Sequence, residues 1–111
     1  MDDKVVVWLH GELKTPPMSE KAREEAGKLL RKLQWGFSLS MPQSRPMTTA
    51  IGPRCHELRI QDTDLIWRVV YRIDEKAIVI MEVFAKKTQT TPQTVIDTCK
   101  QRLALYDGRK V

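Results

Sequence analysis

The chain has 111 residues, of which 41% are hydrophobic and 30% charged, the ordinary balance of one soluble globular domain. Its 19 lysines and arginines outnumber its 14 aspartates and glutamates, so the formal net charge is +5, which is compatible with a polyanionic partner. No apolar run approaches the ~20 residues that a membrane-spanning helix requires, so we expect one domain over residues 1–111 and no membrane segment.

The N-terminal sequence MDDKVVVWLHGEL starts with acidic residues and has only a short apolar run, which is a poor signal peptide. We therefore expect a cytoplasmic protein. Cys55 and Cys99 are far apart and form no CxxC motif, so they are predicted to be buried, reduced thiols. His10 and His56 lack the neighbouring ligands of a zinc site, and we predict neither a metal nor another cofactor.

The first elements are a strand and a helix. The β-rich run Lys4–Leu9 predicts a strand. Ser19 is a suitable N-cap for an amphipathic helix over residues 20–34, and Gly36 should end that helix, with Trp35 covering the sheet beside it. The apolar stripe of the helix recurs at helical spacing and consists of Ala22, Ala26, Leu29, Leu30 and Leu33.

Residues 37–53 contain three prolines and are predicted to be a long connecting loop, anchored to the core by Phe37, Leu39, Met41, Met47 and Ile51. Three strands should follow, at about residues 56–61, 64–73 and 77–85, joined by polar turns. Alternation places Val79, Met81 and Val83 on one apolar face of the last strand. The other face is predicted to be mixed, with Ile78, Ile80, Glu82, Phe84 and Lys86.

A last helix should begin after Thr91 as N-cap and Pro92 as first helical residue, and run to about Tyr106. The predicted order is β-α-β-β-β-α, an α+β domain with an antiparallel-rich sheet and both helices packed on one face.

Several segments together resemble a known family. ELRI, WRVVYRI, a strand that ends in FAKKTQTTP and a helix that closes in RLALY are similar to the phage-derived branch of the RelE/HigB-like toxins, in the RelE/ParE superfamily. The resemblance is best over residues 57–106, and the helix with LLRKLQWG followed by a Pro-containing loop is similar as well. It implies a RelE-like, microbial-ribonuclease-type fold.

The resemblance also implies an activity: a toxin of a type II toxin–antitoxin system that cleaves mRNA without a metal, usually in the ribosomal A site. In this chemistry the ribose 2′-OH attacks the adjacent phosphate. The expected partners are mRNA, the ribosome and a cognate antitoxin, commonly a helix-turn-helix protein. The alternative is a ParE-like, non-enzymatic inhibitor of DNA gyrase, since that branch shares the fold. A nucleic-acid-binding module without toxicity is a third hypothesis.

Such cleavage needs positive charge for the transition state and groups that move protons. Arg68 matches the arginine of the family's central strand, and its alternative role is an ion pair with Glu82. Arg59 matches the ELR arginine, and its alternative is a pair with Glu57 or Glu82.

Lys86 and Lys87 correspond to the family's basic residues at the last strand end, where Thr88 could add a hydroxyl. Tyr106 is a further catalytic candidate, although it continues the apolar stripe of its helix. The RNA-binding candidates are Arg54, His56, Arg72 and Thr88. Of these, His56 alternates with Leu58 and Ile60 rather than with Arg59, which argues against a catalytic role for it.

Overall fold

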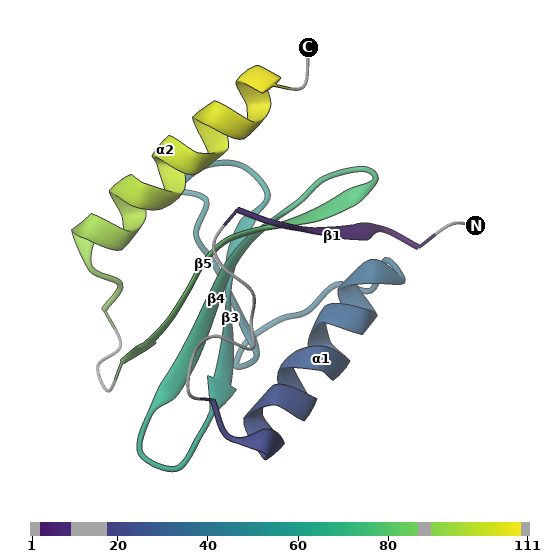
Figure 1. Ribbon diagram of the computed structural model, residues 1–111, viewed down its shortest axis with the longest axis vertical. Helices are drawn as coiled ribbons and strands as arrows, with labels where there is room; N and C mark the ends of the chain where they lie inside the picture. Colours follow the sequence, from purple (N-terminus) through teal and green to yellow (C-terminus); the bar gives the residue numbers. More distant parts are fainter. Residues whose placement is uncertain (1–2, 10–17, 87–89, 110–111) are drawn as a thin grey trace.

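β4 (Ile66–Ile73) and β5 (Ala77–Lys86) form the centre of a five-stranded sheet in the computed structural model, which describes residues 3–9, 18–86 and 90–109 (Figure 1). The strand order is β1-β5-β4-β3-β2, with β3 (Cys55–Gln61) inside and with β1 (Val5–Trp8) and β2 (Ser44–Pro46) at the edges. β1 pairs with β5 in parallel, and the other neighbours are antiparallel. The predicted α+β fold with an antiparallel-rich sheet is confirmed.

The two helices cover opposite faces of this sheet, so the prediction that both pack on one face is wrong. α1 (Glu20–Gln34) packs on a cluster that contains Val69, whereas α2 (Gln93–Arg109) packs on one that contains Val70. Neighbouring residues of a strand point to opposite faces. The central strands are apolar on both faces, and each face is therefore buried by its own helix. Figure 1 shows the sheet running between the two helices.

A β-bulge in β5 changes the predicted distribution of its side chains. Val70 is paired with Glu82 but Tyr71 with Ile80, so Met81 is an extra residue on β5. Before the bulge Val79 and Met81 belong to the α2 side, and after it Val83 packs on the α1 side. The predicted continuous face of Val79, Met81 and Val83 is therefore interrupted, because the bulge shifts the alternation by one residue.

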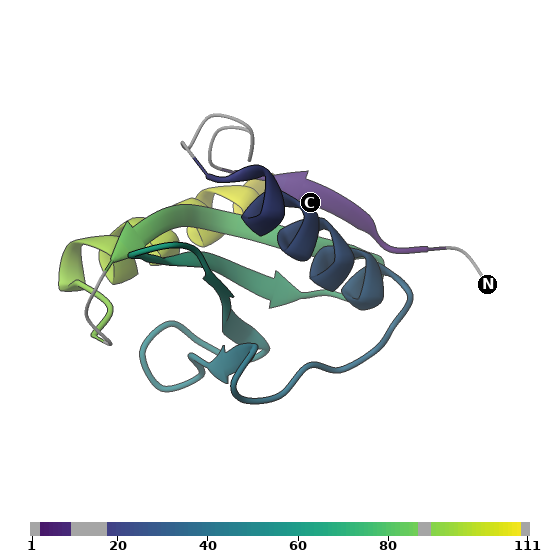
Figure 2. The same ribbon diagram turned by 90° about the horizontal axis from the view of Figure 1, so that it is seen from below.

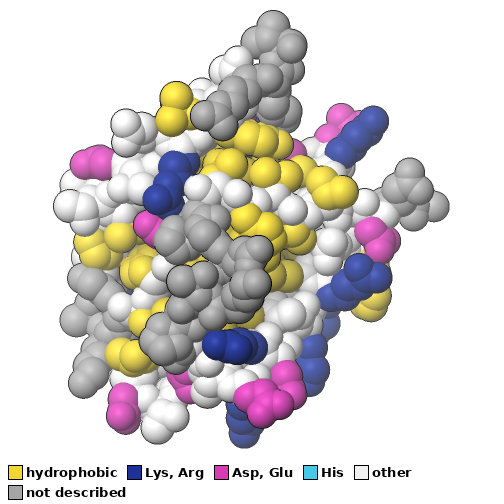
Figure 3. Space-filling model, in the orientation of Figure 1, with side chains coloured by type: hydrophobic (Ala, Val, Ile, Leu, Met, Phe, Trp, Pro, Cys, Tyr) yellow, Lys and Arg dark blue, Asp and Glu magenta, His cyan; other side chains and the backbone are white. Residues whose placement is uncertain are grey.

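The structure of α1 follows the prediction at both ends. Ser19 is the N-cap, and its Oγ accepts a hydrogen bond of 3.1 Å from the amide of Ala22. Gly36 has a φ of 91°, the left-handed conformation that commonly ends a helix. The apolar stripe is buried, and the exposed residues of α1 carry charge of both signs; Figure 3 shows basic and acidic side chains on that edge of the molecule. A charged face of both signs opposite an apolar stripe is typical of a solvated helix.

Two aromatic side chains after α1 are exposed, which corrects two predictions. Trp35 is 54% exposed and does not cover the sheet, and Phe37 is 60% exposed and does not anchor the loop. The two rings make an edge contact with centroids 6.5 Å apart, and the Arg31 guanidinium lies over Trp35 at 5.2 Å.

The segment 37–53 is more regular than predicted, because β2 lies within it. β2 extends the sheet beside β3 at the edge opposite β1 (Figure 2). Leu39, Met47 and Ile51 pack against the core as expected, whereas Met41 is exposed. Within the described parts of the chain, neither helix is long and apolar enough to cross a membrane.

Candidate functional site

A buried carboxylate organises the α2 side of the sheet. Glu57 in β3 is completely buried, and its Oε1 accepts a hydrogen bond of 2.7 Å from Nη1 of Arg68 in β4. The same oxygen lies 3.4 Å from Nη2 of Arg45 in β2. The Thr91 hydroxyl donates to Oε2 at 2.7 Å and accepts from Arg45 Nη2 at 3.1 Å. The carboxylate of Glu57 therefore links β3 to β2, to β4 and to the segment that leads into α2.

A third arginine, Arg59, lies beside this network. Arg59 lies opposite Arg68 in the β3–β4 register and on the same face as Glu57, because residues two apart on a strand share a face. Three arginines, Arg45, Arg59 and Arg68, thus stand against the one carboxylate of Glu57, which leaves two net positive charges among these four groups. Arg45 has a side chain that is 30% exposed, and Arg59 is half-buried, so this charge reaches the surface.

Arg68 is buried and pairs with a carboxylate of β3. It has no exposed surface, so a phosphate can reach it only after the groups that cover it have moved. Its carboxylate partner at 2.7 Å is Glu57, whereas Glu82, the partner considered from the sequence, lies 3.4 Å from Arg102 of α2. A buried charge pair of this kind is costly to break, and Arg68 therefore orders the interior beneath Arg45 and Arg59.

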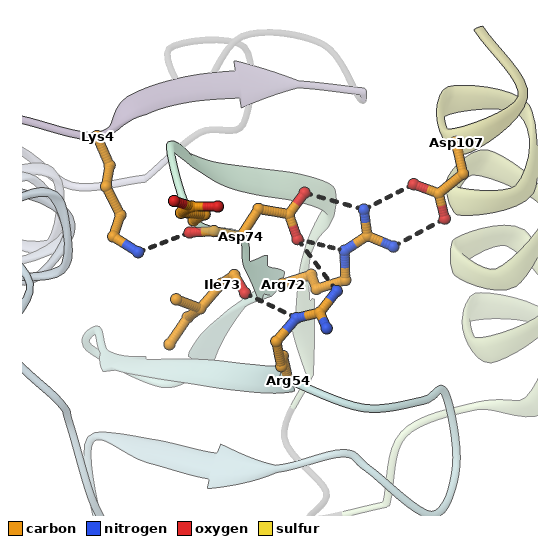
Figure 4. Close-up of a pocket in the computed structure, with 7 residues that line it drawn as sticks. Lys4, Arg54, Arg72, Ile73, Asp74 and Asp107 are labelled. Carbon is orange, nitrogen blue, oxygen red and sulfur yellow. Dashed lines mark hydrogen bonds and ion pairs between the residues drawn. The ribbon is translucent and has the colours of Figure 1, made fainter. Parts of the chain in front are cut away.

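A second charged cluster lies at the other end of β4, around Arg72 (Figure 4). Arg72 Nε and Nη2 donate to the carboxylate of Asp74 at 2.8 and 3.0 Å, and its Nη1 and Nη2 donate to Asp107 of α2 at 2.9 and 2.7 Å. The hydrogen bonds with Asp107, followed by those with Asp74, raise the pKa of Arg72, which stays charged. This guanidinium fastens the end of α2 to the β4–β5 turn.

Arg54 and Lys4 belong to the same cluster. Arg54 has a positive φ of 63°, and its Nε donates to the carbonyl oxygen of Ile73 at 3.0 Å, while Lys4 Nζ donates to that of Asp74. Together with Arg72 these residues line a hollow of about 730 Å³ (Figure 4). The predicted RNA-binding residues Arg54 and Arg72 are therefore separated from Arg59 and Arg68, by roughly 13 Å along β4, four residues at ~3.3 Å each.

His56 lies on the α1 side of the sheet, as its alternation with Leu58 and Ile60 predicted. Its ring stacks on that of Tyr71, with centroids 5.4 Å apart and an interplanar angle of 23°. Burial lowers the pKa of His56, so the neutral imidazole predominates at neutral pH. The sheet separates His56 from Arg59, and the proposed RNA contact of His56 would therefore involve the opposite face.

Tyr106 and Lys86 lie at opposite ends of the α2 side of the sheet. Tyr106 is partly buried against the α2-side core, one residue before Asp107, and so belongs to the Arg72 end. Lys86 is the last residue of β5 and lies opposite Ile66, two residues beyond the Arg68–Phe84 pair. The side chain of Lys86, and Lys87 and Thr88 altogether, lie outside the described part of the chain.

Sequence reasoning missed Arg45 and the role of Thr91. Arg45 fell in the predicted loop, although the proline at position 46 favours an extended conformation at the preceding residue and could have indicated a short strand. Thr91 was predicted to cap α2, but its hydroxyl binds Glu57 and Arg45.

Both cysteines are free and buried, as predicted, and burial raises the pKa of Cys55 and, with the nearby charge of Glu82, that of Cys99 to about 12. Among residues 3–9, 18–86 and 90–109, no three His, Cys, Asp or Glu side chains are grouped so as to hold a metal ion.

The family model of the phage derived protein Gp49-like family (DUF891) matches residues 12–104, which is most of the chain. The chain belongs to this family. The Gp49-like family is associated with toxin–antitoxin systems, and membership implies a cognate antitoxin as partner. No curated protein matches the sequence. The matched range contains α1, β2 to β5 and the Arg45–Glu57–Arg68 network, whereas Tyr106 and Asp107 fall beyond it.

Proposed function

We propose that this Gp49-like protein is the toxin of a type II toxin–antitoxin pair and a metal-independent endoribonuclease that cleaves mRNA in the ribosomal A site. The match to a toxin–antitoxin-associated family is the observation that carries the proposal. The five-stranded sheet with two helices, and the resemblance to RelE/HigB-like toxins in ELRI and WRVVYRI, support membership in the wider RelE/ParE superfamily.

The proposed reaction is a transesterification within the RNA strand. The 2′-oxygen forms a bond to the adjacent phosphorus, the bond from phosphorus to the 5′-oxygen breaks, and the products are a 2′,3′-cyclic phosphate and a 5′-OH end. Negative charge increases on the phosphoryl oxygens during this step, so guanidinium donors at the surface favour it. Arg59 and Arg45 are the described cations best placed to supply these donors.

Lys86 and Lys87 complete the proposed site, because β5 ends beside the β4 residues that flank Arg68. One lysine would add charge at the scissile phosphate, and a lysine whose pKa is lowered by a neighbouring cation could transfer a proton. The antitoxin, for which a helix-turn-helix protein is our proposal, would silence the toxin by covering this face.

The test is expression from a tightly controlled promoter, followed by primer extension on cellular messages. Wild-type protein should arrest growth and create new 5′ ends within translated messages. The double variant Arg59→Ala/Lys86→Ala should reduce cleavage by at least two orders of magnitude, since two charge contacts to the transition state are lost. Lys28→Ala/Lys32→Ala on the exposed face of α1 removes the same charge on the other side of the sheet and is the matched control.

Two results would contradict the proposal. Growth arrest with intact messages, DNA breaks and an SOS response would indicate a gyrase inhibitor of the ParE kind. Full cleavage by Arg59→Ala/Lys86→Ala, with the variant still folded by circular dichroism, would place the catalytic site elsewhere.

A further inference from the structure

A hollow of about 510 Å³ opens between the loop that follows β2 and the segment that leads into α2. Apart from Arg45, its lining residues take no direct part in the proposed reaction. Its volume falls in the range of small-ligand sites. Its walls come from two segments at least 40 positions apart, and the side chains that matter here are Arg45, Met47, Thr48, Thr49, Thr90 and Ile96.

The lining of this hollow combines apolar surface with hydroxyl groups. Ile96 is half-buried and offers apolar surface to a flat ring, and Met47, which is 6% exposed, also lines the hollow. Thr48, Thr49 and Thr90 are exposed, and each hydroxyl can both donate and accept a hydrogen bond. Stacking or apolar contact on a ring, together with hydrogen bonds to its edge, is how proteins recognise unpaired RNA bases.

Arg45 connects the hollow to the proposed site. It lines the hollow, while its Nη2 is held from behind by the Thr91 hydroxyl at 3.1 Å and by Glu57 Oε1 at 3.4 Å. Arg45 on β2 lies opposite Glu57, and Arg59 follows Glu57 two residues later on the same face. The backbone positions of Arg45 and Arg59 are therefore about 8 Å apart, from roughly 6.6 Å along the strand and ~4.8 Å between the strands. Two long arginine side chains at this spacing can contact successive phosphates of one nucleic acid strand.

We propose that the hollow binds one nucleotide of the RNA substrate, next to the scissile phosphate, with its base against Met47 and Ile96 and its phosphate on Arg45. The threonine hydroxyls then determine which base is preferred at that position. This assignment rests on the proposed function for its biological meaning. The larger hollow at Arg72 is less suited to a phosphate, because Asp74, Glu75 and Asp107 contribute negative charge to its lining.

The first experiment maps 5′-OH ends across the transcriptome for wild type and for Thr48→Val/Thr49→Val. Valine keeps the shape of threonine but removes the hydroxyl, so we expect base preference at one position beside the cut to change about tenfold. Thr94→Val, an exposed threonine of α2 outside the lining, is the matched control and should keep the wild-type preference. An unchanged preference in the double variant, with wild-type cleavage intact, overturns the assignment and leaves the proposed function standing.

The second experiment does not require cleavage. Amide chemical shifts of the ¹⁵N-labelled protein are followed while each of the four ribonucleoside 3′-monophosphates, or inorganic phosphate, is added. At least one nucleotide should shift the amides of Thr48, Thr49 and Thr90, in wild type but far less in Thr48→Val/Thr49→Val, and phosphate alone should act mainly near Arg45. If wild type cleaves no RNA but shows these shifts, the nuclease proposal fails while the nucleotide site stands; if no nucleotide shifts these amides, the site is rejected.

Discussion

At the scale of single residues, the carboxylate of Glu57 holds the second sheet face together. It is fully buried between Arg68 and Arg45, and the Thr91 hydroxyl completes its hydrogen bonds. Without it, Arg68 would remain buried without its closest countercharge. Glu57→Ala should therefore lower the free energy of unfolding by about 3–5 kcal/mol, measured by urea denaturation.

Glu24 on the exposed side of α1 provides the comparison for this variant. Glu24→Ala should change the free energy of unfolding by no more than about 0.5 kcal/mol. If Glu57→Ala is no more destabilising than Glu24→Ala, the buried pair does not contribute as the geometry indicates. The same dependence explains why Arg59 and Lys86, rather than Arg68, are the residues to remove in a test of catalysis: loss of Arg68 would mix a folding defect with any catalytic one.

At the scale of elements, Asp62 connects the start of α1 to the β3–β4 turn. Its carboxylate accepts hydrogen bonds from the amides of Ser19 and Thr63 at 3.1 and 2.9 Å, and from the Trp67 indole at 3.0 Å. These bonds, those of Ser19 first, lower the pKa of Asp62 from 3.8 to about 2. A lowered pKa means that the ionised group stabilises the fold above pH 3.8, and that this contribution is lost as the pH falls through about 2.

Asp62→Asn should therefore be less stable than wild type above pH 3.8, and the difference should vanish by about pH 2. Denaturation across this pH range, with an NMR titration of the Asp62 carboxyl, measures both quantities. Asp64→Asn, in the same turn, removes a carboxylate without removing these hydrogen bonds and is the matched control. A titration midpoint near 3.8 for Asp62 would show that the three hydrogen bonds do not hold it in solution.

The end of α2 depends on Arg72 in a comparable way. Asp107 is half exposed, and its pair with Arg72 is the contact that fastens the last turns of α2 to β4. Asp107→Ala should cost up to about 1 kcal/mol, since the pair is partly solvated, which corresponds to roughly fivefold faster hydrogen exchange in those turns. Gln101→Ala, exposed on the same helix, is the control. Unchanged exchange in Asp107→Ala would show that apolar packing alone holds the helix.

Local patterns in the sequence predicted the elements well, and long-range geometry explains what they missed. The spacing of Ala22 to Leu33 and the Ser19 cap are local signals, so α1 was predicted at its observed bounds. The bulge at Met81 has no local signal, and it reverses which face each later residue of β5 occupies. Which carboxylate contacts Arg68 depends on how β3, β4 and β5 lie relative to one another. Alternation along β4 alone could not distinguish Glu57 of β3 from Glu82 of β5.

At the scale of the whole molecule, the net charge of +5 matters through its distribution. The exposed residues of α1 include three carboxylates spread among five cations, and Arg31 also pairs with Asp3 at 3.3 Å, whereas the α2 side of β2 to β4 brings three arginines together around one carboxylate. Under the proposed function, RNA should bind to this face and release counterions. With three or four phosphate contacts, from Arg45, Arg59, Lys86 and Lys87, the logarithm of the affinity should fall with the logarithm of salt concentration with a slope of about −2 to −3.

Comparing this salt-dependence slope between variants distinguishes RNA bound at the proposed face from RNA attracted only by the overall positive charge of the protein. An RNA oligonucleotide with 2′-O-methyl groups cannot be cleaved by 2′-OH attack, so its affinity is measurable by fluorescence anisotropy across a salt series. Arg59→Ala should make the slope less steep by about 0.7, the share of one contact with a single strand. Lys28→Ala removes the same charge from α1 and should leave the slope unchanged, because Lys28 lies on the other side of the sheet. If both variants reduce the slope equally, the RNA is attracted by overall charge and has no preferred face.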